Sequence, residues 1–187
     1  MVGARARVGP EGGTGDEATR GHAGGDARRW LRERLAGLLG AALLLLMAVN
    51  FLTVLPRKSI TTDEVVHIPA GYTYLARGDF RPNDEHPPLV KLWAALPFLA
   101  LDPEPPPLLP ADTPDRRTLN NARYFWEANR DRFVTLAFWP RVPMVALTLA
   151  LGALIFAYAR RLFGPRAAVL AVALFSLEPT VLAHGRV

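Results

Sequence analysis

LAGLLGAALLLLMAVNFLTVL, residues 35–55, is an apolar run without a charged side chain. As a helix rising about 1.5 Å per residue it would span roughly 30 Å, the thickness of a bilayer core. The run is too long for the apolar region of a typical signal peptide, and Pro56-Arg57-Lys58 follows it instead of a small-x-small cleavage site. It therefore predicts an uncleaved membrane helix.

Arginines at the ends of the apolar runs predict the orientation of the chain. Arg28, Arg29, Arg32 and Arg34 precede residues 35–55, which places the N-terminus in the cytoplasm by the positive-inside rule. Arg57 and Lys58, on the far side, weigh against this. Val142 to Ala159 and Ala167 to Ala183 are two further candidate spans, joined by a short loop containing Arg160, Arg161, Gly164-Pro165 and Arg166. That loop is expected to be cytoplasmic and to join the two runs in a tight helical hairpin. Residues 56–141 are then expected on the outer side of the membrane.

The expected fold is an all-α membrane protein with about three transmembrane helices and a long outer loop that contains short interfacial helices. Four segments are expected: a disordered cytoplasmic tail (1–27), the first membrane helix (28–55), the outer loop with amphipathic helices (56–141) and a membrane hairpin (142–187). The tail is rich in glycine and charge and has too few large apolar side chains to offset the entropy cost of ordering.

Composition excludes several kinds of chemistry. The 187 residues include no cysteine, which rules out disulfides, thiolate metal sites and cysteine catalysis. The net charge is +5, but the arginines cluster beside apolar runs and no nucleic-acid motif is recognisable, so we expect a membrane rather than a nucleic acid as the partner.

The outer loop carries local signals of its own. Thr61-Thr62-Asp63-Glu64 reads as a capping box that begins a helix, and Pro69 should kink or shorten that helix. The apolar stretch from Leu89 to Leu101 is too short to cross a bilayer and is expected at the interface or beneath the membrane domain. Asp102 to Asp115 reads as a Pro-rich surface loop. An aromatic belt is expected where six residues crowd before the second span: Tyr124, Phe125, Trp126, Phe133, Phe138 and Trp139.

Acidic residues near the predicted membrane surface are candidates for chemistry. Asp63-Glu64 and Glu85-His86 are suited to general base catalysis or to binding a divalent cation. His67 shares a helix face with Asp63 if the helix continues past Pro69. The structural alternatives are strong, because acids in a first helical turn are favoured by the macrodipole and one adjacent acid–histidine pair is a poor metal motif. Glu178, inside the third apolar run, is either functional or simply reaches water.

The order of these motifs resembles a known family. After the first membrane helix come Asp63-Glu64, Gly71-Tyr72-x-Tyr74, Gly78-Asp79-Phe80, Asn83-x-Glu85-His86-Pro87-Pro88-Leu89 and Lys91. Ala137-Phe138-Trp139-Pro140-Arg141-Val142-Pro143 and Glu178-Pro179-x-x-Leu182-Ala183-His184-Gly185 follow. This set is similar to bacterial members of the protein O-mannosyltransferase and aminoarabinose transferase superfamily, glycosyltransferases of the GT-C fold, over about residues 30 to 187.

The resemblance implies an inner-membrane enzyme that transfers a sugar from a polyprenyl-phosphate carrier to a protein or lipid hydroxyl, with inversion. Asp63 matches the catalytic base of the family. Glu85 matches an acid near the donor phosphate that binds a metal in some members, so it is a candidate ligand for a divalent cation. Glu64, His86, Lys91 and Arg141 are the other expected substrate-binding residues, the last two as phosphate partners by charge.

Family members usually have more membrane helices, so we expect the complete protein to be longer and the chain alone to be inactive. Two alternatives are a non-catalytic multi-pass protein of membrane assembly or transport and a fragmentary gene product without function.

Overall fold

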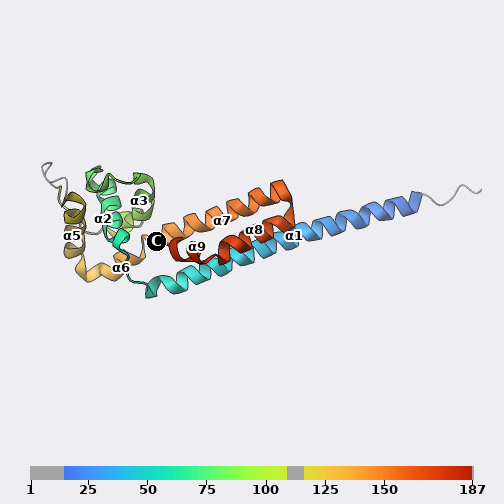
Figure 1. The fold of residues 1–187 in the computed structure, drawn as a ribbon, viewed down its shortest axis with the longest axis horizontal. Helices are drawn as coiled ribbons and strands as arrows, with labels where there is room; N and C mark the ends of the chain where they lie inside the picture. The colour runs from blue at the N-terminus through green and yellow to red at the C-terminus, as the bar shows by residue number, and fades with distance from the viewer. Residues whose placement is uncertain (1–14, 109–115, 187) are drawn as a thin grey trace, which may run out of the picture.

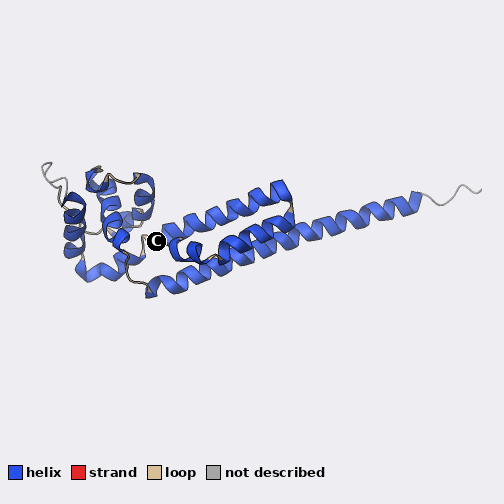
Figure 2. Ribbon diagram, viewed as in Figure 1, coloured by secondary structure: helices blue, strands red, loops and turns tan. Residues whose placement is uncertain are grey.

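The computed structural model describes the backbone of residues 15–108 and 116–186, and side chains from residue 28 onward within those ranges. Every regular element in these ranges is a helix (Figure 2). A long bundle contains α1 (Gly15–Val54), α7 (Arg141–Phe163), α8 (Pro165–Leu177) and α9 (Pro179–His184). The segment between α1 and α7 forms a separate cluster of short helices at one end of this bundle, and we call it the outer cluster (Figure 1).

Two helices are long and apolar enough to cross a membrane, one over residues 28–57 and one ending at Phe163. Only 22% of the apolar window in the first and 17% in the second is buried within the chain. Helices of a soluble core would be mostly buried, so these exposed apolar faces suit a lipid environment. One buried hydrophobic cluster of the bundle contains Met47, Phe51, Leu55 and Val145.

The expected third span is wrong in its extent. α8 has 13 residues, about 20 Å at 1.5 Å per residue, which is shorter than a bilayer core. It ends because Pro179 disfavours a helical conformation at Glu178, whose φ and ψ are −70° and 124°. The Glu178 carboxylate then accepts the Val181 backbone N–H at 2.6 Å and caps α9. Its polar group is thereby satisfied within the chain.

The hairpin predicted between the second and third apolar runs is confirmed. Gly164 alone separates α7 from α8, with a φ of 87° that favours glycine. The N-terminal boundary differs from expectation, because α1 begins at Gly15 and not near Arg28. Extending an existing helix is far easier than nucleating one, so a membrane helix can recruit the residues before it. Residues 1–14 of the expected tail lie outside the described ranges.

The outer cluster consists of η1 (Leu55–Arg57), α2 (Thr62–Arg77), η2 (Arg81–Asn83), α3 (Pro88–Ala95), α4 (Phe98–Leu101), α5 (Arg117–Ala128), η4 (Arg130–Arg132) and α6 (Phe133–Phe138). Its core is formed by Ile68, Tyr72, Ala95, Phe98, Phe125 and Leu136. Leu89 to Leu101 therefore packs one face into this core, while Leu89 and Leu99 remain exposed. The predicted aromatic belt is divided, because Phe125 is fully buried while Tyr124, Phe133 and Trp139 are exposed.

Pro69 does not end α2, which continues to Arg77. A proline in a helix leaves the carbonyl four residues earlier without its usual donor, here Val65. The Trp126 indole N–H of α5 donates to that carbonyl at 2.9 Å. The predicted surface loop after α4 is likewise fixed at its start, because the Tyr72 hydroxyl donates to the Pro103 carbonyl at 2.8 Å and Asn129 bonds both backbone groups of Glu104. Residues 109–115 of that loop lie outside the described ranges.

The crossing of α2 and α3 depends on Gly71. A Cβ added there would clash with the Lys91 carbonyl oxygen, a backbone atom that cannot move without shifting α3. Gly71→Ala should therefore destabilise the protein by about 1–3 kcal/mol, seen as a lower Tm by circular dichroism in detergent micelles. Gly37→Ala is the matched control, since nothing lies within 4 Å of the added atom. It should be neutral or stabilising by up to about 1 kcal/mol. Equal Tm values for both variants would contradict the close approach.

Candidate functional site

A buried ion pair joins the outer cluster to the long helical bundle. Glu64, in the first turn of α2, is held by the predicted capping box: its backbone N–H donates to Thr61 Oγ1 at 3.3 Å and its carboxylate accepts the Thr61 N–H at 2.8 Å. The same carboxylate accepts hydrogen bonds from Nε of Arg141 at 2.6 Å and from Nη2 of Arg141 at 2.8 Å. Glu64 is 7% and Arg141 3% exposed, so the pair is almost fully removed from solvent.

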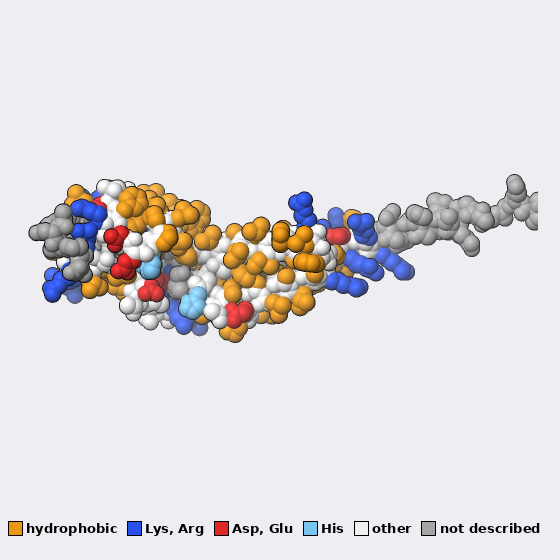
Figure 3. Space-filling view, turned by 45° about the horizontal axis from the view of Figure 1, so that its top comes forward, with side chains coloured by type: hydrophobic (Ala, Val, Ile, Leu, Met, Phe, Trp, Pro, Cys, Tyr) orange, Lys and Arg blue, Asp and Glu red, His pale blue; other side chains and the backbone are white. Residues whose placement is uncertain are grey.

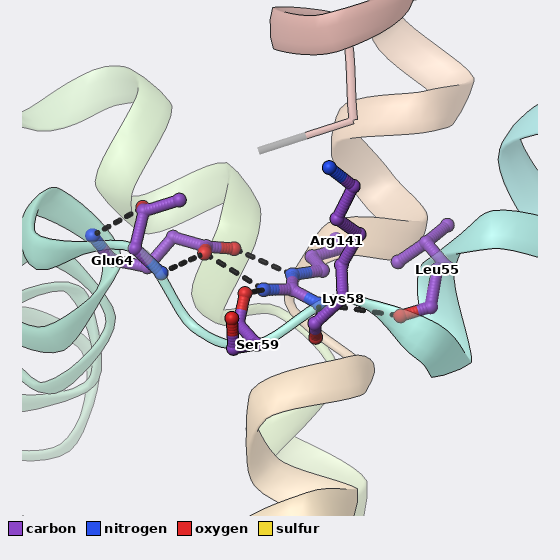
Figure 4. A network of polar contacts seen from close by, with 6 residues as sticks. Leu55, Lys58, Ser59, Glu64 and Arg141 are labelled. Carbon is purple, nitrogen blue, oxygen red and sulfur yellow. Dashed lines mark hydrogen bonds and ion pairs between the residues drawn. The ribbon is translucent and has the colours of Figure 1, made fainter.

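The other N–H groups of Arg141 donate to backbone carbonyls of the connection between α1 and α2. Nη1 donates to the carbonyls of Leu55 and Lys58 at 3.3 and 3.1 Å, and Nη2 donates to Ser59 at 3.0 Å (Figure 4). A guanidinium has five N–H groups, and these contacts use all of them. In this arrangement Arg141 has no N–H left for a phosphate, and Glu64 is committed to Arg141. Both residues, expected to bind substrate, hold the first helices together here.

A cavity of about 550 Å³ lies beside this pair, between α2, α3 and the start of α7. Part of its wall is apolar and part is ionisable. The lining residues are Thr61, Thr62, Asp63, Glu64, His67, Ile68, Val90, Lys91, Ala94, Pro140, Arg141, Met144 and His184. Acidic and histidine side chains gather on this face of the molecule, where the outer cluster meets the bundle (Figure 3). The cavity thus brings Asp63 together with Glu64, Lys91 and Arg141 of the predicted set.

Asp63 has the features of an available base. It is exposed, it lines the cavity, and within the described parts of the chain its carboxylate has no hydrogen bond or ion-pair partner. His67 lies one turn later on the same wall, so the predicted shared face of α2 is confirmed. A free carboxylate next to a half-buried imidazole is suited to accepting a proton from a bound hydroxyl.

The electrostatic surroundings of His67 favour its neutral form. Burial lowers the pKa of His67 below its ordinary value of 6.5, and the charges of Lys91 and His86 lower it further. The carboxylates of Asp63 and Glu85 oppose this effect. His86 is exposed and its ring meets that of His67 edge to face, with centroids 5.2 Å apart.

Lys91 lies in the cavity wall, but its ammonium group is hydrogen-bonded to residues that do not line the cavity. Its Nζ donates to the Tyr74 hydroxyl at 3.0 Å and to the backbone and side-chain oxygens of Asn83 at 2.6 Å each. These contacts use all three ammonium donors. Burial lowers the pKa of Lys91, against the opposing charges of Asp84 and Glu85, and burial also raises the pKa of Tyr74 to about 12. Lys91 can therefore act on a bound anion through its charge, whereas direct donation would require it to leave Asn83 or Tyr74.

Glu85 and His86 lie beside the cavity and do not line it. Glu85 is exposed, and its charge acts on both His67 and Lys91. Among the residues that the structure describes, no group of three or more His, Asp or Glu side chains converges as a metal site would require. A role of Glu85 as a cation ligand stays a prediction.

Sequence reasoning did not assign His184 or the apolar wall to the site. His184 comes from the last described helix, far from α2 in sequence, and reaches the cavity because α8 and α9 return toward the outer cluster (Figure 1). In the sequence, the one indication that His184 belongs to the site was its position in the Glu178–Gly185 motif. Val90 and Ala94 flank Lys91 at helical spacing, a pattern that predicts an apolar face but not what the face covers.

Comparison of the chain with protein-family models, with curated proteins and with solved structures gave no match in any of the three. We therefore infer the function of the chain from its own residues.

Arg141→Ala should destabilise the protein by about 3–5 kcal/mol, because it leaves the Glu64 charge buried without a partner. The measurement is the loss of helix on heating or in denaturant, in detergent micelles. Arg123→Ala is the matched control, since Arg123 pairs with Glu127 at the surface with both side chains more than 60% exposed. That change should cost less than about 1 kcal/mol. Similar losses in the two variants would contradict a special role for the buried pair.

The lowered pKa of His67 makes the stability depend on pH. The unfolded chain binds this proton more tightly than the folded one, so stability is highest above pH 6.5 and decreases as the pH falls through the folded-state pKa. His67→Gln should remove part of this decrease. Tm measured from neutral to mildly acidic pH should fall less steeply in the variant than in the wild type. Parallel curves would show that His67 is not the group responsible.

Proposed function

We propose that this protein is a membrane glycosyltransferase that moves a sugar from a polyprenyl-phosphate carrier to a hydroxyl group of a protein or lipid acceptor, with inversion. One observation carries the proposal: Asp63 presents an unpartnered carboxylate in a partly apolar cavity at the junction of the outer helices and the membrane bundle. A donor anchored by a lipid must be met at the membrane surface, and this junction is where such a surface would lie. The motif order supports the same assignment.

Asp63 is the proposed general base. Its carboxylate takes the proton of the acceptor hydroxyl while the acceptor oxygen bonds to the anomeric carbon. The bond from that carbon to the phosphate oxygen breaks, and polyprenyl phosphate leaves with the electron pair. The fixed positive charge of Lys91 stabilises the developing negative charge on the phosphate. His67, whose pKa is lowered by burial, lies on the same cavity wall and is placed to hydrogen-bond the acceptor hydroxyl.

The other expected substrate residues receive different roles. Glu85 and His86 stand at the edge of the cavity, where they can contact the sugar or the headgroup. Glu64 and Arg141 position α2 and α7 and do not touch the substrate. We assign no step to a divalent cation, because Glu85 has no converging second and third ligand among the described residues.

The proposed topology puts the cavity on the outer face of the plasma (inner) membrane. The N-terminus and the turn at Gly164 lie in the cytoplasm, in line with the arginines at that end of the bundle. Polyprenyl-phosphate sugars would then reach Asp63 from the outer leaflet.

A non-catalytic role in membrane assembly or transport is the second candidate. The observation that favours it is the internal saturation of Arg141 and Lys91, whose N–H groups all bind the chain itself. In that case the cavity would be a structural gap and Asp63 only a favourable first-turn residue.

Asp63→Asn separates the two candidates. In membranes carrying the protein and a panel of polyprenyl-phosphate sugars, it should lower transfer by about 10²–10⁴-fold, the usual contribution of a positioned general base. Asp131→Asn makes the same chemical change at an exposed residue of η4 outside the cavity and should leave transfer unchanged. Tm should be nearly the same for both variants. Transfer that survives Asp63→Asn would rule out the proposed base.

A further inference from the structure

A second cavity lies at the opposite end of the bundle, between α1 and α8. Its volume is about 280 Å³. One part of its wall carries two guanidinium groups and the rest is mainly aliphatic. The lining residues are Arg32, Leu35, Ala36, Leu39, Arg166 and Val169, together with Pro165 at the start of α8.

The two arginines are available to a ligand. Arg32 and Arg166 are exposed, and within the described ranges neither has an acidic partner or a hydrogen bond. Arg160, nearby on α7, differs because its guanidinium is paired with Glu33 of α1 at 2.7 Å. That ion pair joins α1 to α7 and neutralises one charge, but it leaves the charges of the cavity uncompensated.

The surroundings reinforce the positive charge. Arg28, Arg29, Arg34 and Arg161 lie at the same end of the molecule, where Figure 3 shows basic side chains gathered around the bundle. The first turn of α8 also meets the cavity through Pro165 and Arg166, and a helix N-terminus carries partial positive charge. A ligand of this cavity must therefore be anionic.

The aliphatic wall identifies the kind of anion. Leu35 and Leu39 are about half exposed and continue into the exposed leucines along α1. A soluble phosphate would use the two guanidinium groups and leave this wall uncovered. A phospholipid uses both parts, because its phosphate pairs with the arginines while an acyl chain lies along the leucines.

We propose that this cavity is a binding site for an anionic phospholipid of the leaflet next to the Gly164 turn. Arg32 and Arg166 hold the phosphate, and Leu35, Leu39 and Val169 contact the first part of an acyl chain. The site requires only that the bundle spans a membrane and is independent of the proposed transferase activity.

Lipid retention by the purified protein tests the proposal. The chain is transferred into mixed micelles that contain phosphatidylglycerol or phosphatidylcholine with identical acyl chains, and bound lipid is measured by native mass spectrometry. The wild type should retain phosphatidylglycerol roughly tenfold better and gain Tm with it. Glycerol phosphate at the same concentration should give no such gain. Equal retention of the two lipids, or an equal gain with glycerol phosphate, would overturn the proposal without any variant.

Two double variants locate the site. Arg32→Gln with Arg166→Gln removes the two cavity charges, and Arg28→Gln with Arg29→Gln removes two charges from the same end without touching the cavity. Only the first pair should abolish the preference for phosphatidylglycerol. If both pairs reduce it equally, the preference comes from diffuse charge and the cavity is not the site. Circular dichroism checks that both variants keep the helical content of the wild type.

Discussion

The structure depends on one buried pair of charges. Glu64 and Arg141 lie where α1 ends, α2 begins and α7 begins, and the guanidinium also binds three carbonyls of the connection after α1. A chain that leaves a helix has carbonyls without helical partners, and Pro56 ends α1 at this point. Arg141 supplies the missing donors from far along the chain. Removing either charge would leave the other desolvated and uncompensated.

This pair also explains the position of the candidate site. The cavity has Glu64 and Arg141 in its wall, so its shape follows from the junction they hold. Asp63 precedes Glu64 by one residue, and an α-helix directs neighbouring side chains about 100° apart. While Glu64 turns inward to the pair, Asp63 remains exposed on the cavity side. Adjacent acids thus have different roles, one structural and one available for chemistry.

Local chemistry predicted much of this arrangement. The capping box at Thr61, the shared face of Asp63 and His67 and the turn at Gly164 each involve residues within a few positions of one another, so the sequence alone was sufficient. Features that depend on distant partners were not predictable in this way. Arg141 looked like a phosphate ligand because its carbonyl partners lie more than 80 residues earlier. Pro69 was expected to kink or shorten α2, and the helix continues to Arg77 because the compensating donor, Trp126, belongs to the distant helix α5. His184 lies at the cavity because α8 runs back along α7 toward the outer cluster and ends early. The apolar composition of this run had instead predicted one full membrane span.

The single residue between α7 and α8 bears on how α8 can lie in a bilayer. α8 is too short to cross a bilayer by itself, and its exposed leucines would be unfavourable in water. With only Gly164 as connection, α8 can lie in a bilayer only beside α7, as the returning arm of one hairpin. They are suited to enter the membrane together, with the shorter helix carried in by the longer one and its broken end, at Glu178, directed toward the outer helices.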